Sequence, residues 1–111
     1  MDEFQLISKL DNLPRLINEA GIEWADAKEM SDLMEDMKKS ILAKIKNEKE
    51  GGEQSRERQA LATDSYINHI KALHLATNKT LKAKVKYEAL IRQHESIRTR
   101  LSLEKAKANI V

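Results

Sequence analysis

The longest stretch of this sequence without glycine or proline that keeps a regular apolar pattern lies between positions 55 and 107. Apolar residues recur in it at every third or fourth position, which is the spacing that one face of an α-helix requires. The stretch therefore predicts a single helix over 55–107, about 75 Å long at ~1.5 Å per residue. Helices of this length pair with other helices, so we expect an all-α protein.

The composition favours the same fold class. Charged residues make up 34% of the chain, aromatic residues 4%, and there are only one proline and three glycines. This balance is typical of long helices. The chain contains no cysteine, which excludes disulfides and thiolate chemistry. There is no signal-peptide pattern, no long apolar run and no lipidation motif, so we expect a cytoplasmic protein.

The first 21 residues contain two signals that interrupt a helix. Pro14 disfavours helix at Leu13 and suits the first turn of a new helix, with Asp11 or Asn12 as the N-cap. Gly21 belongs to the residue type that commonly follows the end of a helix. We therefore expect short N-terminal helices over 1–21 and a first long helix over 22–50.

The pair Gly51-Gly52 predicts a turn over 51–54, and Ser55 can cap the helix that follows it. The expected architecture is a single helical domain over 1–111: an antiparallel helical hairpin or coiled coil with one very long C-terminal helix. The second helix exceeds the first by some 20 residues on the ~1.5 Å rise per residue. We expect either the N-terminal segment 2–20 or a second chain to cover its apolar end, where Tyr87 and Ile97 lie.

The residues that face the other helix are expected to follow a 3-4 repeat. In the first helix the predicted row is Ala27, Met30, Met34, Met37 and Ile41, widened by Trp24, Leu33, Leu42 and Ile45. In the second helix it is Tyr66, Ile70, Leu73, Thr77, Thr80, Lys84, Tyr87, Ile91, His94, Arg98 and Leu101. The apolar members of both rows are the predicted protein-interface residues. The methionines are either ordinary core or an adaptable groove for a protein partner.

Charge divides the chain into an acidic head and a basic body. Positions 1–36 hold ten acids and three bases, and the remainder holds 17 bases and eight acids. This division predicts either a nucleic-acid-binding half or two segments that neutralise each other. A helical row of bases makes the first explanation specific, because such a row can follow a phosphate backbone. The predicted nucleic-acid-binding residues are Lys79, Lys82, Lys86 and Arg100, broadened by Lys84, Arg92 and Arg98.

No arrangement that would support catalysis is present. His69 and His74 are five residues apart, which puts them about 140° apart around a helix and prevents a shared metal site. The sequence has neither a glycine-rich phosphate loop nor a nucleophile elbow. We expect a protein that is not an enzyme, with no cofactor, no metal, no small-molecule substrate and no membrane association.

A set of short motifs carries a resemblance to a known group of proteins. The motifs are KKS at 38–40, SRERQALA at 55–62, Tyr66, Ala76, YEAL at 87–90 and ESIRT at 95–99. In these motifs the chain resembles small helical proteins of phages and prophages that accompany single-strand annealing or recombinase genes. The resemblance implies a viral origin and a role in DNA recombination or replication, and it carries over no catalytic residue.

Three functional hypotheses follow, and the third is a purely architectural coiled-coil spacer in which neither set of charges matters. The first is a self-associating accessory protein that contacts single-stranded DNA or a recombinase through the basic helix face. The second is a protein-binding inhibitor or assembly module, which uses either the acidic head as a mimic of nucleic acid or the methionine-rich groove.

Overall fold

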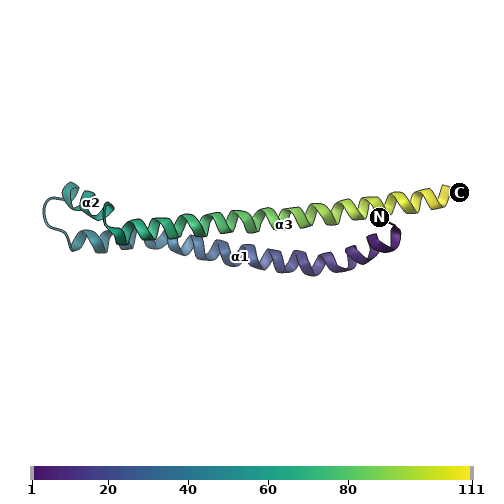
Figure 1. Cartoon of the computed structure of the whole chain (residues 1–111), viewed down its shortest axis with the longest axis horizontal. Helices are drawn as coiled ribbons and strands as arrows, with labels where there is room; N and C mark the ends of the chain where they lie inside the picture. The colour runs from purple at the N-terminus through teal and green to yellow at the C-terminus, as the bar shows by residue number, and fades with distance from the viewer. Residues whose placement is uncertain (1, 111) are drawn as a thin grey trace. The chain divides into compact units, whose positions relative to one another are not determined.

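Three helices make up the chain in the computed structural model, which describes residues 2–110 (Figure 1). They are α1 (Glu3–Asn47), α2 (Glu53–Leu61) and α3 (Asp64–Ile110). No strand occurs among the described residues. The predicted fold class is confirmed: the protein is all-α, with a long N-terminal helix and a very long C-terminal helix that pair as a hairpin.

The chain divides into two compact units. Unit 1 combines the residues up to Trp24 with those from Lys82 onward, and unit 2 is Ala25–Leu81. In each unit a segment of α1 packs against a segment of α3, and unit 2 also contains α2. Each unit is described by itself below.

Helix α1 passes through both predicted interruptions, so the expected short N-terminal helices over 1–21 are wrong. The helix begins with a reciprocal cap, in which Asp2 Oδ1 accepts a hydrogen bond from the Gln5 amide at 2.8 Å and Gln5 Oε1 accepts one from the Asp2 amide at 3.1 Å. Asn12 does not cap a new helix, because its side-chain amide donates to the Ser8 carbonyl within α1. Pro14 removes one backbone hydrogen bond, and we attribute the continuity of the helix to tertiary packing on either side.

Gly21 has a packing role rather than the predicted role of ending a helix. A Cβ built at this position would lie 3.3 Å from Cε2 of Tyr87. The Tyr87 ring lies beside Trp24, with the ring centroids 5.4 Å apart. Glycine therefore allows the aromatic pair of unit 1 to approach the α1 backbone closely.

The core of unit 1 joins the N-terminal segment to the far part of α3. Leu6 and Leu13 of α1 are buried against Ile97 and Leu101 of α3. Three half-buried residues pack around them: Leu10, Ile17 and Leu90. Of the two predicted ways to cover the apolar end of the long helix, the structure has the first, in which the N-terminal segment does so.

Unit 2 contains the connection between the helices. Gly51 has φ 109°, a left-handed conformation that favours glycine, and Gly52 is the N-cap of α2. The prediction of Ser55 as the cap is wrong, because the helix already begins at Glu53. Lys46 forms an ion pair with Glu53, and its hydrogen bond and positive charge hold the pKa of the Glu53 carboxyl below its ordinary value.

The predicted unbroken helix over 55–107 is wrong at one place. The chain leaves α2 after Leu61 and begins α3 at Asp64. Thr63 makes the break: its hydroxyl donates to the Ala60 carbonyl at 2.7 Å and accepts a hydrogen bond from the Tyr66 amide at 3.3 Å. The break lets α2 turn so that Ala60, which has no exposed surface, packs with Ile45 and Tyr66.

Replacing Thr63 with alanine is expected to lower the free energy of unfolding by about 1 kcal/mol, because the first turn of α3 loses its side-chain cap. Urea unfolding followed by circular dichroism measures the change. Thr99→Ala is the control, since Thr99 is exposed within α3 and alanine suits a helix interior. A loss no larger than that of the control would show that the hydroxyl does not define the start of α3.

The residues of α3 that face α1 follow a 3-4 repeat in both units, but in a register that differs from the predicted one. The members of this row are Tyr66, His69, Leu73, Ala76 and Thr80 in unit 2, and Ala83, Tyr87, Leu90, His94, Ile97 and Leu101 in unit 1. Ile70 and Ile91, which were predicted in the row, are half-buried beside it. Thr77, Lys84 and Arg98 were predicted in this row, and all three are exposed. The small Ala76 and Ala83 take their places, which leaves the charged side chains in water.

The same correction applies to α1. Ser31 and Lys38 are half-buried where Met30 and Met37 were predicted, and both methionines are exposed. Lysine tolerates such a position because its stem can lie along the apolar surface while its amine reaches water. The remaining predicted interface residues of α1 keep contact with the core: Trp24, Ala27, Met34 and Ile41 are buried or half-buried.

Candidate nucleic-acid interface

All seven predicted nucleic-acid-binding residues are exposed on α3, but they do not form one row. Successive residues of an α-helix lie about 100° apart, so six of the seven surround unit 1's part of α3 on three sides. One flank of the contact row holds Lys82, Lys86 and Arg100. Lys84 and Arg98, predicted to broaden that flank, lie on the opposite flank instead, and Arg92 points directly away from α1. The seventh residue, Lys79, belongs to unit 2.

Two lysines of unit 1 are already engaged. The amine of Lys86 is 3.1 Å from a carboxylate oxygen of Glu23 on α1. The amine of Lys84 is 4.0 Å from Glu88 and 6.0 Å from the centroid of the Trp24 ring. The other four bases (Lys82, Arg92, Arg98 and Arg100) form no ion pair within 4.0 Å in the part of the chain that the structure describes. Their charges are therefore available to an anionic ligand.

The sequence left two explanations of the charge division open: a nucleic-acid-binding half, or two segments that neutralise each other. The charges of unit 1 show features of both. Its N-terminal residues 2–24 hold five acids and two bases, and its α3 part holds eight bases and three acids. Only one ion pair in the described part of unit 1, Lys86–Glu23, joins the two helices. Folding therefore places the acidic segment beside the basic one without removing most of the positive charge from the α3 surface.

Aromatic side chains are poorly placed to stack on bases. Tyr66 is buried in the core of unit 2. Tyr87 is half-buried against Trp24 and Gly21. The chemistry of the exposed surface is thus that of phosphate contact, which is independent of sequence and depends on salt.

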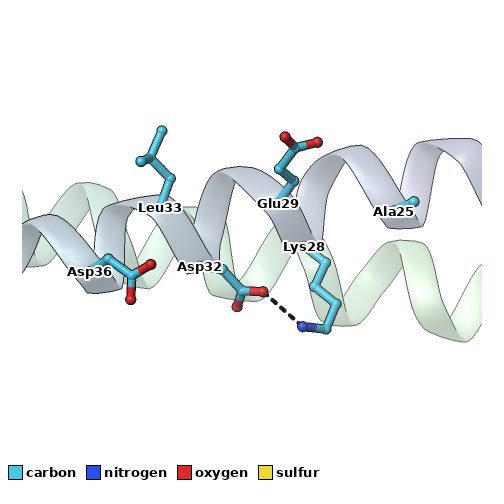
Figure 2. A pocket seen from close by; sticks show the side chains of 6 residues that line it. All are labelled: Ala25, Lys28, Glu29, Asp32, Leu33 and Asp36. Atoms are coloured by element: carbon cyan, nitrogen blue, oxygen red, sulfur yellow. Dashed lines mark hydrogen bonds and ion pairs between the residues drawn. The ribbon is translucent and has the colours of Figure 1, made fainter.

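The part of α1 in unit 2 presents an acidic surface. Figure 2 shows a shallow hollow there, lined by Ala25, Lys28, Glu29, Asp32, Leu33 and Asp36. Lys28 and Asp32 pair with each other at 2.8 Å within the helix, while Leu33 and Glu29 project to the other side of α1 (Figure 2). Neither Glu29 nor Asp36 has an ion-pair partner within 4.0 Å among residues 2–110.

Large apolar residues on this surface were not predicted as functional. Leu33 of α1 and Leu75 of α3 are both exposed in unit 2, beside the exposed Met30 and Met37. Leu33 was predicted to widen the row of α1, and it is exposed instead; only the observed contact rows separate the two leucines from core residues.

The histidines show no arrangement for chemistry. Nε2 of His69 lies 2.9 Å from the Met34 carbonyl oxygen and so joins α3 to α1 within unit 2. Among the described residues, no group of three or more histidine, aspartate and glutamate side chains could hold a metal ion. Within the same residues, no helix is long and apolar enough to cross a membrane.

Fold and surface together define an all-α hairpin protein with a basic outer surface in one unit and an acidic, partly apolar surface in the other. The sequence matches no model of a protein family, no curated protein and no solved structure.

Proposed function

We propose that this chain is a non-enzymatic accessory protein that binds single-stranded nucleic acid through the basic surface of α3 in unit 1. The observation that carries the proposal is the set of four exposed bases without ion-pair partners, Lys82, Arg92, Arg98 and Arg100. Bases on three sides of one helix can contact consecutive phosphates of a flexible strand that curves around it, which duplex DNA cannot do as readily.

The setting of this activity is proposed from the sequence resemblance. The resemblance to small helical proteins of phages that accompany single-strand annealing or recombinase genes implies a place in DNA recombination or replication, where single strands are exposed. In that setting the basic surface contacts either the strand itself or a recombinase bound to it, in the cytoplasm of the host.

Binding is tested by fluorescence anisotropy of a labelled oligothymidine. Because phosphate contacts release counterions, we expect binding at ~50 mM salt that falls at least tenfold by ~200 mM. The triple variant Lys82→Gln, Arg92→Gln, Arg100→Gln is expected to bind at least tenfold more weakly at ~50 mM and to reduce the salt slope by about 3.

A matched triple variant controls for net charge. Lys39→Gln, Lys44→Gln and Lys49→Gln remove the same charge from α1 and the adjoining turn in unit 2, and their effect on affinity should stay below about threefold, since screening limits charges at a distance. No binding by the wild type at ~50 mM salt, or equal effects of the two triple variants, would contradict the proposal.

A second candidate function is a protein-binding module, and the exposed Met30, Leu33 and Met37 favour it. These side chains form an adaptable apolar strip on α1, next to the acids of the same helix. In this case the partner is a protein, including a further copy of this chain. Reversing the charges of Glu29, Asp32 and Asp36 should then abolish partner binding and leave affinity for DNA intact or raised.

A further inference from the structure

We propose that unit 2 binds a second copy of this chain through one side of its α1–α3 pair. The inference does not depend on nucleic-acid binding, which we place in unit 1. The docking side is defined by four exposed apolar residues: Met30 (55% exposed), Leu33 (52%) and Met37 (44%) on α1, and Leu75 (72%) on α3.

The four residues lie on the same side of unit 2. Met30 and Met37 each come directly before a residue of the α1 contact row, Ser31 and Lys38. On α3 the equivalent positions are Ala72 and Lys79, which come directly before Leu73 and Thr80. Equivalent flanking positions of two antiparallel helices lie on the same side of the pair. Leu33 follows Met30 by three residues and Leu75 follows Ala72 by three, so both leucines extend the side outward.

Burial of this side needs a partner, because a pair of helices covers only the row between them. Four large apolar side chains remain in water on the docking side. The side that holds Leu81 and Ile67 has no such strip on its α1 part, where the matching positions are Ala25, Asp32 and Lys39. The contact that would remove most apolar surface from water is therefore on the side of Met30 and Leu75.

The charges of α1 and α3 in unit 2 favour a second copy of this chain over an acidic or a basic partner. The α1 segment 25–37, which carries the three apolar residues of the docking side, is acidic: Lys28 is the only base among five acids. The four lysines of α1 in unit 2 beyond it lie at 38–47, outside this strip. After Asp64 at the start of α3, positions 65–81 contain Lys71 and Lys79 and no acid, so this segment is basic. No ion pair within 4.0 Å joins these two segments in the described residues. An acidic partner would be repelled by α1 and a basic partner by α3, whereas a second copy offers each helix its complement.

A two-fold axis between two copies gives both helices of unit 2 an oppositely charged neighbour. If α1 of one copy lies against α3 of the other, the same contact occurs twice, and each acidic helix has a basic neighbour in its own chain and in the partner. The product is a bundle of four helices, in which Met30, Leu33 and Met37 of one copy meet Leu75 of the other.

Light scattering over a range of concentrations tests the contact. The wild type is expected to reach twice the chain mass of 12.7 kDa. Leu75→Glu should remain at the monomer mass at the concentration where the wild type is half dimeric. Leu81→Glu is the matched control, because Leu81 is also exposed on α3 of unit 2, at 56%, but lies on the opposite side. It should dimerise like the wild type, and circular dichroism should show equal helicity for all three.

A charge exchange identifies the occupant as a second copy. Asp26→Lys, Glu29→Lys and Asp36→Lys change the α1 segment 25–37 from five acids and one base to two acids and four bases, and Lys71→Glu with Lys79→Glu makes the α3 segment 65–81 acidic. Each of these two charge variants alone repels itself at both contacts and should dimerise at least tenfold more weakly. An equimolar mixture restores both contacts and should recover the dimer.

Three results would overturn the proposal. A wild type that stays monomeric at every concentration excludes the contact. Equal effects of Leu75→Glu and Leu81→Glu place the contact elsewhere. Charge variants that fail to combine in the mixture show that α1 of one copy does not face α3 of the other. None of these results bears on DNA binding by unit 1, which the anisotropy experiment tests separately.

Discussion

Replacing Ala83 with lysine is expected to lower the free energy of unfolding by about 2–4 kcal/mol, a large effect for one substitution. Ala83 is buried in the contact row of unit 1, between Thr80 and Tyr87 on the same face of α3. A lysine there either places its amine among apolar side chains or forces the two helices apart. Its flexible stem can carry the amine toward water, which keeps the cost below that of a fully buried charge.

The control is the same substitution at a second alanine of the same helix. Ala89 is exposed and also belongs to unit 1. Ala89→Lys should change the free energy of unfolding by less than about 0.5 kcal/mol, as surface substitutions usually do. Urea unfolding at one protein concentration gives both values. If the two variants are equally stable, Ala83 does not face α1. The predicted register, with Lys84 in the contact row, would then be the correct one.

The contact row that these two variants test was predicted only in part from the sequence. The period of the apolar pattern gave the correct fold class and placed Tyr66, Leu73, Tyr87 and Leu101 in the contact row. The phase of the pattern was wrong at Lys84 and Arg98, since a 3-4 repeat permits either of two neighbouring residues at every second position. Alanine decides between them in the structure, but a hydrophobicity pattern gives its small side chain little weight.

Helix ends were harder to predict than helices. Pro14 and Gly21 predicted interruptions that tertiary packing overrides, because Leu13 is buried next to the proline and the glycine accommodates the Tyr87 ring. The real interruption is at Thr63, which has no glycine or proline near it. The order threonine, aspartate, serine at 63–65 is typical of a helix start, yet it lies within a stretch that is helix-forming on both sides.

The candidate site was predictable in kind but not in arrangement. Exposed bases on α3 follow from the sequence alone, and the structure bears out their exposure. Their distribution over three sides of the helix depends on which row faces α1. Because the phase of that row was predicted wrongly, Lys84 and Arg98 were also placed on the wrong flank. The exposed leucines of unit 2 could not be separated from core residues by sequence, because the sequence does not show that only α1 and α3 pack together where Leu33 and Leu75 lie.

Replacing Leu13 with alanine is expected to cost about 2–5 kcal/mol, the range measured for large-to-small changes in well-packed cores. Leu13 is almost completely buried and lies in one cluster with Leu6, Ile97 and Leu101. The cluster is small, and few neighbours can move to fill the space left by the lost atoms. The effect should therefore be concentrated in unit 1, where this cluster holds the N-terminal segment against α3.

Hydrogen exchange locates the effect of Leu13→Ala. Amides of α1 before Trp24 and of α3 after Lys82 should lose protection, while those of unit 2 around Ile45 and Tyr66 should keep most of theirs, because units with separate cores can open separately. Leu103→Ala is the control: Leu103 is exposed on α3 only two residues beyond Leu101, and its loss should change neither stability nor protection by a comparable amount. Equal loss of protection in both units would mean that the hairpin opens as one cooperative body. Unchanged protection in unit 1 would mean that the N-terminal segment does not depend on Leu13 for its contact with α3, and that the far part of the long helix is covered in some other way.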